Sequence, residues 1–175
     1  MLKNSKTVIL DYGIGNIESI SNAFIYCGAE DVSLSKDKAI IERADRLILP
    51  GVGAFANGMN GLKENKLIPL IKSFVESGKP LMGICLGMQM LASSSEEFGI
   101  HDGLDLIPGK VKPMPLSRVG NKKVKLPFIG WASLNKNIKG VSKNKMHIDS
   151  HSFYFVHSYY FEVKDELNLT HYYDY

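Results

Sequence analysis

Gly83-Ile84-Cys85-Leu86-Gly87 follows an apolar run at residues 80–82 and leads into a helix-compatible stretch at 88–92. A small residue on each side of a central nucleophile, at a strand-to-helix turn, is the nucleophile-elbow pattern, with cysteine in place of serine. The turn is too sharp for side chains at the flanking positions, and it pushes the strained central residue out of the sheet. The following helix points free N–H groups and its positive dipole end at Cys85, which favours the thiolate. The pattern predicts a reactive thiol; the alternative is a buried structural cysteine between two packing glycines.

Strand and helix signals alternate through the first half of the chain. Apolar or β-branched runs predict strands at 7–10, 31–35, 46–49 and 80–84, and apolar residues at helical spacing predict helices at 17–27 and 67–75. Asn16 can cap the first helix, and Gly28 can end it. This alternation predicts an α/β fold with a doubly wound, mostly parallel sheet of the flavodoxin-like type. Its active site lies beyond the carboxyl ends of the strands, where the loops at 12–16 and 50–55 would meet the elbow.

The second half of the chain changes character. Residues 111–116, 124–134 and 151–161 have β-like composition and are separated by polar or Pro/Gly turns. Convincing helical periodicity is absent between them. We expect an antiparallel extension carried on the main sheet.

Composition indicates one globular domain spanning 1–175, with 45% hydrophobic and 22% charged residues. The net charge of +3 is too small to argue for a nucleic-acid partner. The two cysteines, Cys27 and Cys85, give no disulfide framework, and a reactive thiol suits a reducing compartment. The sequence shows no signal peptide and no segment long enough to cross a bilayer. We therefore expect a soluble, cytoplasmic protein with no membrane partner.

Two glycine loops are candidate ligand sites. Residues 13–18 depart from the dinucleotide pattern G-x-G-x-x-G because Glu18 stands at the third glycine position, so a plain turn into a helix is favoured. The loop Pro50-Gly51-Val52-Gly53-Ala54-Phe55 can present backbone N–H groups as an oxyanion hole requires, with the amide of Leu86 as a second donor. The alternative for the second loop is an ordinary β-turn.

Histidines offer general bases, at positions 101, 147, 151, 157 and 171. None stands in a metal-ligand pattern with another histidine or a cysteine, so no metal site is expected. His157 is flanked by aromatic residues, which favours a packed or hydrogen-bonded strand histidine. The other four are expected on the surface or in turns.

Taken in order, these motifs resemble those of the class I (triad) glutamine amidotransferases, and most closely the glutaminase subunits of imidazole glycerol phosphate synthases. The matching stretches run through the chain: residues 11–16, 49–55, 83–89, 103–109, 127–131 and 154–159. The resemblance implies that Cys85 attacks the side-chain amide of glutamine and forms a glutamyl thioester. It also implies an oxyanion hole of backbone groups at Val52, Gly53 and Leu86, and no cofactor. The residues implied to hold glutamine are Gly51, Gln89, Glu97, His157, Ser158 and Tyr159.

The resemblance further implies a partner. The ammonia would pass to a (β/α)₈-barrel synthase subunit in a heterodimer and be used in histidine biosynthesis. Trp131 is expected either to contact that partner or to lie in the core. An alternative is a paralogous subunit that supplies ammonia for surface-sugar synthesis, and another is a Cys hydrolase of the same α/β type.

Two departures from the family pattern stand out. The family completes its triad with a His-Pro-Glu motif, and these 175 residues contain none. On this ground we expect a chain truncated at its carboxyl end, a poor glutaminase, and a sheet with one face incompletely covered; a catalytically inactive binding module is the matching alternative. The family's Pro-His-x-Gly-Trp-Asn reads Pro127-Phe128-Ile129-Gly130-Trp131-Ala132 here, which removes polar groups expected to face the partner.

Overall fold

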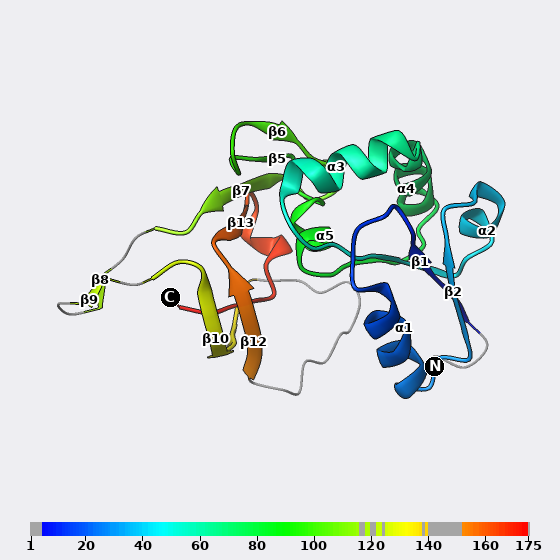
Figure 1. Cartoon of the computed structure of the whole chain (residues 1–175). Helices are drawn as coiled ribbons and strands as arrows, with labels where there is room; N and C mark the ends of the chain where they lie inside the picture. Colours follow the sequence, from blue (N-terminus) through cyan, green and yellow to red (C-terminus); the bar gives the residue numbers. More distant parts are fainter. Residues whose placement is uncertain are drawn as a thin grey trace.

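The computed structural model describes residues 5–115, 118–119, 122–123, 125–137, 139 and 152–174. Its centre is a four-stranded, all-parallel sheet in the order β2-β1-β3-β4 (Figure 1). The strands are β1 (Lys6–Leu10), β2 (Asp31–Ser35), β3 (Arg46–Leu49) and β4 (Leu81–Gly83). The predicted parallel sheet is confirmed, with each strand within a few residues of its expected place.

Helices cover both faces of this sheet. They are α1 (Ile17–Tyr26), α2 (Lys38–Glu42), α3 (Phe55–Glu64), α4 (Leu67–Glu76) and α5 (Leu86–Gln89). The chain moves outward from β1 to β2 and then back across the sheet to β3. Because crossovers between parallel strands are right-handed, this reversal places α1 on the opposite face from α3 and α4, as Figure 1 shows. The doubly wound prediction is therefore confirmed.

Two of these helices, α1 and α4, were expected from periodicity, whereas α3 was not. Helix α3 contains Gly58 and Gly61, which lower helix propensity. Both glycines permit close packing: a Cβ atom on Gly58 would lie 2.5 Å from Met90 Sδ, and one on Gly61 would lie 3.0 Å from the ring of Tyr12. Tertiary contact therefore outweighs local propensity.

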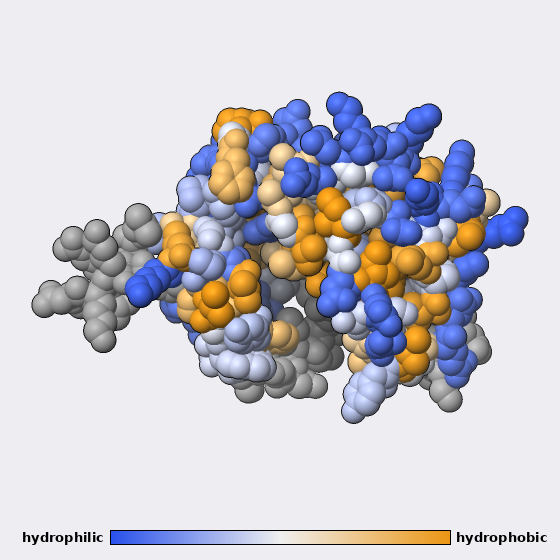
Figure 2. Space-filling view, in the orientation of Figure 1, coloured by the Kyte–Doolittle hydropathy of each residue, from blue (hydrophilic) through white to orange (hydrophobic). Residues whose placement is uncertain are grey.

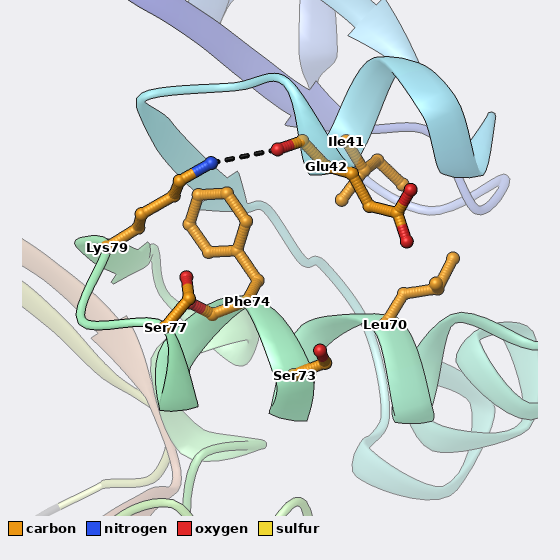
Figure 3. A pocket seen from close by; sticks show the side chains of 7 residues that line it. All are labelled: Ile41, Glu42, Leu70, Ser73, Phe74, Ser77 and Lys79. Carbon is orange, nitrogen blue, oxygen red and sulfur yellow. Dashed lines mark hydrogen bonds between the residues drawn. The ribbon is translucent and has the colours of Figure 1, made fainter.

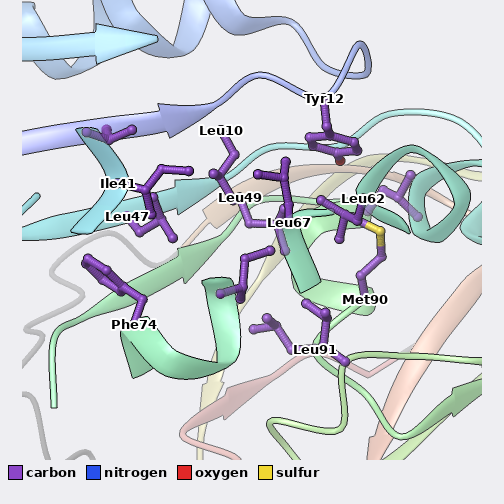
Figure 4. Close-up of a cluster of buried hydrophobic side chains, with 14 of the residues drawn as sticks. Leu10, Tyr12, Ile41, Leu47, Leu49, Leu62, Leu67, Phe74, Met90 and Leu91 are labelled. Carbon is purple, nitrogen blue, oxygen red and sulfur yellow. The ribbon is translucent and has the colours of Figure 1, made fainter. Parts of the chain in front are cut away.

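The main core lies between the sheet and helices α3 and α4 (Figure 4). Alternate strand residues enter it because side chains alternate between the faces of a strand. The sheet contributes Val8, Leu10, Leu47 and Leu49, and the helices contribute Phe55, Leu62, Leu67, Ile71 and Phe74.

The opposite face of the sheet, on the side of α1, is less well covered. Its central residues Ile9 and Ile48 are buried, but Leu34 and Met82, beside them in register on the outer strands, are 49% and 47% exposed. None of the residues of α1 is fully buried.

The second half of the chain forms separate sheets, so the expectation of an extension carried on the main sheet is wrong. A second four-stranded sheet has the order β13-β7-β5-β6. It pairs β7 antiparallel with β13 and β5 antiparallel with β6, but β5 runs parallel to β7. Its strands are β5 (Ser94–Ser95), β6 (His101–Asp102), β7 (Gly109–Pro113) and β13 (Tyr159–Val163). The elbow and α5 turn the chain out of the main sheet after β4, so a new sheet begins.

An antiparallel ribbon stands beside this second sheet. It consists of β10 (Phe128–Ser133) and β12 (Ser152–His157), with Gly130 opposite Phe155 and Trp131 opposite Tyr154. The remaining short elements are β8 (Arg118–Val119), β9 (Lys122–Lys123), β11 (Asn135–Lys136), η1 (Glu166–Asn168) and β14 (His171–Tyr172). The predicted antiparallel character of the second half is confirmed by these pairs.

Candidate active site

Cys85 occupies the elbow that the sequence predicts. Its φ of +54° and ψ of −117° lie in a region that L residues rarely adopt, and its side chain is exposed, so it is not a buried structural cysteine. The flanking glycines are sterically required. A Cβ atom on Gly87 would lie 1.9 Å from the carbonyl oxygen of Leu49, and one on Gly83 would lie 2.6 Å from Cα of Met88. The strand-to-helix turn of a nucleophile elbow is therefore present.

The helix behind the elbow is shorter than expected. The sequence suggested helix through 88–92, but α5 begins at Leu86 and ends at Gln89. The carbonyl groups of Met90 and Leu91 instead accept hydrogen bonds from the amides of Leu104 and Ile107, at 2.9 Å and 3.0 Å. Because α5 has only one turn, its helix dipole is smaller than the sequence suggests. The free amide of Leu86, its first residue, is the more direct source of positive potential beside Cys85.

The three loops expected at the strand ends do meet. A Cβ atom on Gly15 would lie 3.0 Å from Cβ of Pro50, and one on Gly51 would lie 2.7 Å from the amide nitrogen of Gly87. The phenol of Tyr12 donates a hydrogen bond of 2.5 Å to the carbonyl oxygen of Pro50. Tyr12 is buried, and burial raises the pKa of its phenol well above the ordinary value because the phenolate would lose its hydration. The predicted convergence is confirmed.

The glycine loop keeps its amides available. Gly53 has a φ of +87°, which only glycine adopts without strain, and the side chain of Val52 is half-exposed. Within the part of the chain that the structure describes, no protein group accepts a hydrogen bond from the amides of Gly51, Val52 or Gly53. The amide of Leu86 likewise has no acceptor among the described residues, so these four donors can bind an anionic oxygen.

The residues expected to hold glutamine make hydrogen bonds in two different places. The side-chain amide of Gln89 donates to the carbonyl oxygen of Tyr159 at 3.2 Å, which ties α5 to β13. The adjacent carbonyl of Ser158 accepts from the amide of Met114 at 2.9 Å. Glu97 is engaged elsewhere: its carboxylate accepts a 2.6 Å hydrogen bond from the amide of Phe55 at the far end of the glycine loop.

His157 is a hydrogen-bonded strand histidine, as expected. Its Nδ1 lies 2.8 Å from the carbonyl oxygen of Tyr159, and its Nε2 is hydrogen-bonded to the phenol of Tyr173. Phe128, Phe155 and Tyr173 surround the imidazole. Both ring nitrogens are therefore occupied.

Two of the other histidines correct the expectation of surface or turn positions. His101 and His171 are half-buried in strands β6 and β14, because these short strands form only through tertiary pairing. His147 and His151 lie outside the described residues. Among the described histidines, none is hydrogen-bonded to the thiol of Cys85.

Trp131 is not a core residue. Its side chain is 72% exposed and packs edge-on against Tyr154, with ring centroids 5.7 Å apart. Ile129 and Val156, which lie opposite each other on the same face of the ribbon, are also exposed. Figure 2 shows hydrophobic surface over this β10–β12 ribbon. We call these four side chains the ribbon patch.

A hollow between α2 and α4 contains none of the predicted site residues (Figure 3). Its volume is about 150 Å³, and Ile41, Leu70 and Phe74 contribute its apolar surface. Lys79 donates to the carbonyl oxygen of Glu42 at 2.8 Å and stands over the ring of Phe74. The cation of this hollow is thus already engaged by protein groups.

Sequence reasoning missed the hydrogen bonds of Tyr12 and Phe55, which tie the glycine loop to distant parts of the chain. No local signal marks a tyrosine at the end of a strand as a donor to a residue 38 positions away.

Within the described residues, no helix is long and apolar enough to cross a membrane. Within the same residues, no cluster of three or more His, Cys, Asp or Glu side chains is placed to hold a metal ion.

Comparison with known proteins gives a consistent picture. The family model "Glutamine amidotransferase class-I" matches residues 8–174. Imidazole glycerol phosphate synthase subunit HisH 1 of Legionella pneumophila (strain Paris) is 48% identical over 161 residues, covering 89% of this chain and 74% of that protein. The HisH subunits of Bacillus cereus (strain B4264) and Aquifex aeolicus (strain VF5) are 43% and 40% identical, covering 91% and 92% of this chain and 72% and 74% of theirs.

Solved structures support the same fold. A crystal structure of a glutamine amidotransferase matches with a TM-score of 0.59 and 19% identity, covering 86% of this chain and 70% of that one. The structure of PurLQS from Thermotoga maritima matches with a TM-score of 0.61 and 19% identity, covering 97% of this chain and 74% of that one.

Proposed function

The chain belongs to the class-I glutamine amidotransferases, and from that premise we propose that it hydrolyses glutamine as the glutaminase subunit of an imidazole glycerol phosphate synthase in histidine biosynthesis. One observation carries the chemistry. A strained, exposed Cys85 stands in an elbow flanked by Gly83 and Gly87, and the loop at 50–55, with its free amides, packs against this elbow. A nucleophile beside preorganised donors is the arrangement that acyl transfer requires.

In the proposed reaction, the Cys85 thiolate attacks the side-chain amide carbon of glutamine. The carbonyl π electrons move to oxygen, and the amides of Val52, Gly53 and Leu86 are the proposed donors to the resulting oxyanion. Collapse of the tetrahedral intermediate breaks the carbon–nitrogen bond, releases ammonia and leaves a γ-glutamyl thioester. Water then attacks the thioester, which yields glutamate and restores the thiol.

Departure of the amine requires a proton, and thioester hydrolysis requires a base. Neither group is supplied by a described residue hydrogen-bonded to Cys85. The first test of the proposal is therefore covalent labelling of the thiol by a substrate analogue, which does not require complete turnover.

Substrate contacts are proposed for Gly51, Gln89, Glu97 and the segment His157-Ser158-Tyr159. The link between Gln89 and Tyr159 supports this proposal because it brings α5 and the start of β13 to the same side of the elbow. Among the described residues, only Oε2 of the Glu97 carboxylate is engaged, by the Phe55 amide, so Oε1 is the proposed acceptor for a substrate ammonium group.

The proposed partner is a (β/α)₈-barrel synthase subunit that receives the ammonia in a heterodimer. The names of the relatives, each a subunit of a synthase, support the existence of a synthase partner. The exposed Trp131 is the proposed contact, because large aromatic side chains are enriched at the centres of interfaces. Two free cysteines favour a reducing compartment, so the cytoplasm is the proposed location.

The test is covalent labelling with a diazo-ketone analogue of glutamine. The proposal expects stoichiometric labelling of Cys85, protection by glutamine, and no labelling of a Cys85→Ala variant. Cys27 is the internal control because it is also exposed but lies outside an elbow. Equal labelling of both cysteines, unaffected by glutamine, would contradict the proposal.

A further inference from the structure

The loop at 50–55 is fastened at both ends by side chains from outside it. At the first end, the Tyr12 phenol donates to the Pro50 carbonyl at 2.5 Å. At the other end, the Glu97 carboxylate accepts from the Phe55 amide at 2.6 Å. The free amides of Gly51, Val52 and Gly53 lie between these two points.

We propose that Tyr12 and Glu97 are positioning residues that hold the two ends of this loop, so that its free amides stay against the Cys85 elbow. This inference rests on the proposed function and deepens it, since the amides are those assigned to the oxyanion. Neither side chain needs to touch the reacting atoms to act in this way.

The Tyr12 end is rigid because the tyrosine is itself buried. Its ring packs against Gly61 of α3, and its side chain is only 4% exposed. Gly15, in the same turn, packs against Pro50. The glycine turn after β1 therefore contacts Pro50, the first residue of the oxyanion loop, from two sides: through Tyr12 and through Gly15. This is a structural role and not that of a dinucleotide site.

The Glu97 end replaces a missing helix cap. Ala54 is the N-cap residue of α3, and its side chain makes no capping hydrogen bond. Glu97 supplies the acceptor from a distance of 42 residues along the chain. It is oriented by its own loop, where the Glu97 amide donates to the hydroxyl of buried Ser95 at 3.1 Å.

This arrangement explains why the two contacts matter for chemistry. Gly53 has a positive φ, and a Cβ atom placed on it would meet nothing within 4 Å, so its immediate surroundings do not restrain the middle of the loop. Gly51 is held by its own packing against Leu86 and Gly87, whereas the orientation of the Val52 and Gly53 amides depends on the fixed ends. An oxyanion hole gains its effect from donors that need no reorganisation, so loss of either end contact weakens it.

The experiment uses the 175-residue chain in a Cys27→Ser background, with ¹⁵N relaxation of the Val52 and Gly53 amides as the first measurement. We expect order parameters of about 0.85 in the parent, and below about 0.6 in Tyr12→Phe and in Glu97→Ala. Glu97→Gln is the rescue variant, because its amide oxygen still accepts from Phe55. Two variants are matched controls. Tyr160→Phe removes a tyrosine hydroxyl that bonds to Glu162, and Glu96→Ala removes the carboxylate next to Glu97 in the sequence.

The second measurement compares two labelling rates at Cys85. The diazo-ketone analogue carries a carbonyl that the loop would polarise, whereas iodoacetamide alkylates the thiol with no oxyanion. Tyr12→Phe should slow the analogue by about tenfold or more and change the iodoacetamide rate less than about twofold. Glu97→Ala is tested by relaxation alone, because Glu97 is also a proposed substrate contact. A purely structural role would move both rates together.

The outcomes separate the inference from the function on which it rests. Unchanged order parameters in both variants overturn the inference, whatever the labelling shows. If the analogue fails to label the parent while the order parameters fall, the proposed function fails and the positioning of the loop stands. If Tyr12→Phe does not fold, Glu97→Ala and its Gln rescue decide the matter.

Discussion

At the scale of single residues, Cys85 shows how the fold sustains a strained nucleophile. Its φ of +54° and ψ of −117° are unfavourable for any residue with a side chain. Such a conformation costs on the order of 1–3 kcal/mol, and it persists only where the surroundings impose it. Here the imposition comes from Gly83 and Gly87, which pack directly against backbone.

The strain at Cys85 leads to a first prediction. Cys85→Gly should be more stable than Cys85→Ala by about 1 kcal/mol, because glycine adopts positive φ without a steric penalty. Both variants should lose labelling by the glutamine analogue. Urea unfolding monitored by circular dichroism measures the difference. An alanine variant as stable as the glycine variant would show that the backbone at position 85 is not strained.

Tyr12 gives a prediction of pH dependence. Its pKa in the folded chain is raised above the ordinary value of 10.0, so above pH 10 the unfolded chain loses a proton that the folded chain retains. The stabilisation is thus complete below pH 10 and decreases as pH rises, by about 1.4 kcal/mol per pH unit. Tyr12→Phe lacks this term.

The measurement is the free energy of unfolding of the parent and of Tyr12→Phe from pH 8 to 11.5. The advantage of the parent should be constant up to about pH 10 and then shrink. A difference that stays constant across the whole range would mean that the phenol ionises as readily in the folded chain as in the unfolded one.

At the scale of elements, contact between backbones decides where the elbow stands. Strand β3 ends at Leu49, whose carbonyl lies so near Gly87 that any Cβ atom there would be 1.9 Å away. With any larger residue at position 87, helix α5 could not begin directly over the end of β3. The same closeness brings Gly51 against Leu86 and places the glycine loop beside the thiol.

Gly87→Ala should therefore destabilise the fold by about 3 kcal/mol or more, because the atom that it meets is backbone and cannot rotate away. The matched control is Gly130→Ala in β10, where a Cβ atom would meet nothing closer than 3.7 Å. The control should change stability by less than about 0.5 kcal/mol. Thermal melts of both variants test this, and equal destabilisation would contradict it.

At the scale of the whole molecule, the chain divides into a covered core and an uncovered ribbon. The core between the sheet and helices α3 and α4 is one continuous cluster of buried apolar side chains. The ribbon patch of Ile129, Trp131, Tyr154 and Val156 is exposed on one face of the ribbon. Exposed apolar patches of this kind mark interaction sites more often than they stabilise a monomer.

The ribbon patch gives the last prediction. Trp131→Ala should weaken binding to the proposed barrel synthase by about 2 kcal/mol, a roughly thirtyfold rise in Kd, while changing the stability of the free chain by less than about 1 kcal/mol. Tyr26→Ala is the matched control, because Tyr26 is a 93% exposed aromatic residue on α1. A titration against the synthase and a melt of each free variant measure both effects. Collapse of the melt with unchanged affinity would assign Trp131 a structural role.

The sequence by itself determined the parallel sheet, the elbow and the meeting of the glycine loops. These features depend on local causes: runs of apolar residues define strands, and glycines mark turns that no other residue can make. The family resemblance follows from the same motifs. The element boundaries around them were predicted to within a few residues, apart from the early end of α5.

Only the tertiary structure decided the rest. It placed the second-half strands in separate sheets, put Trp131 on the surface, and formed α3 despite its glycines. It also joined Tyr12 to Pro50 and Glu97 to Phe55, across 38 and 42 residues. Such contacts leave no periodic trace in a sequence, because each depends on how distant segments pack and not on the residues beside it.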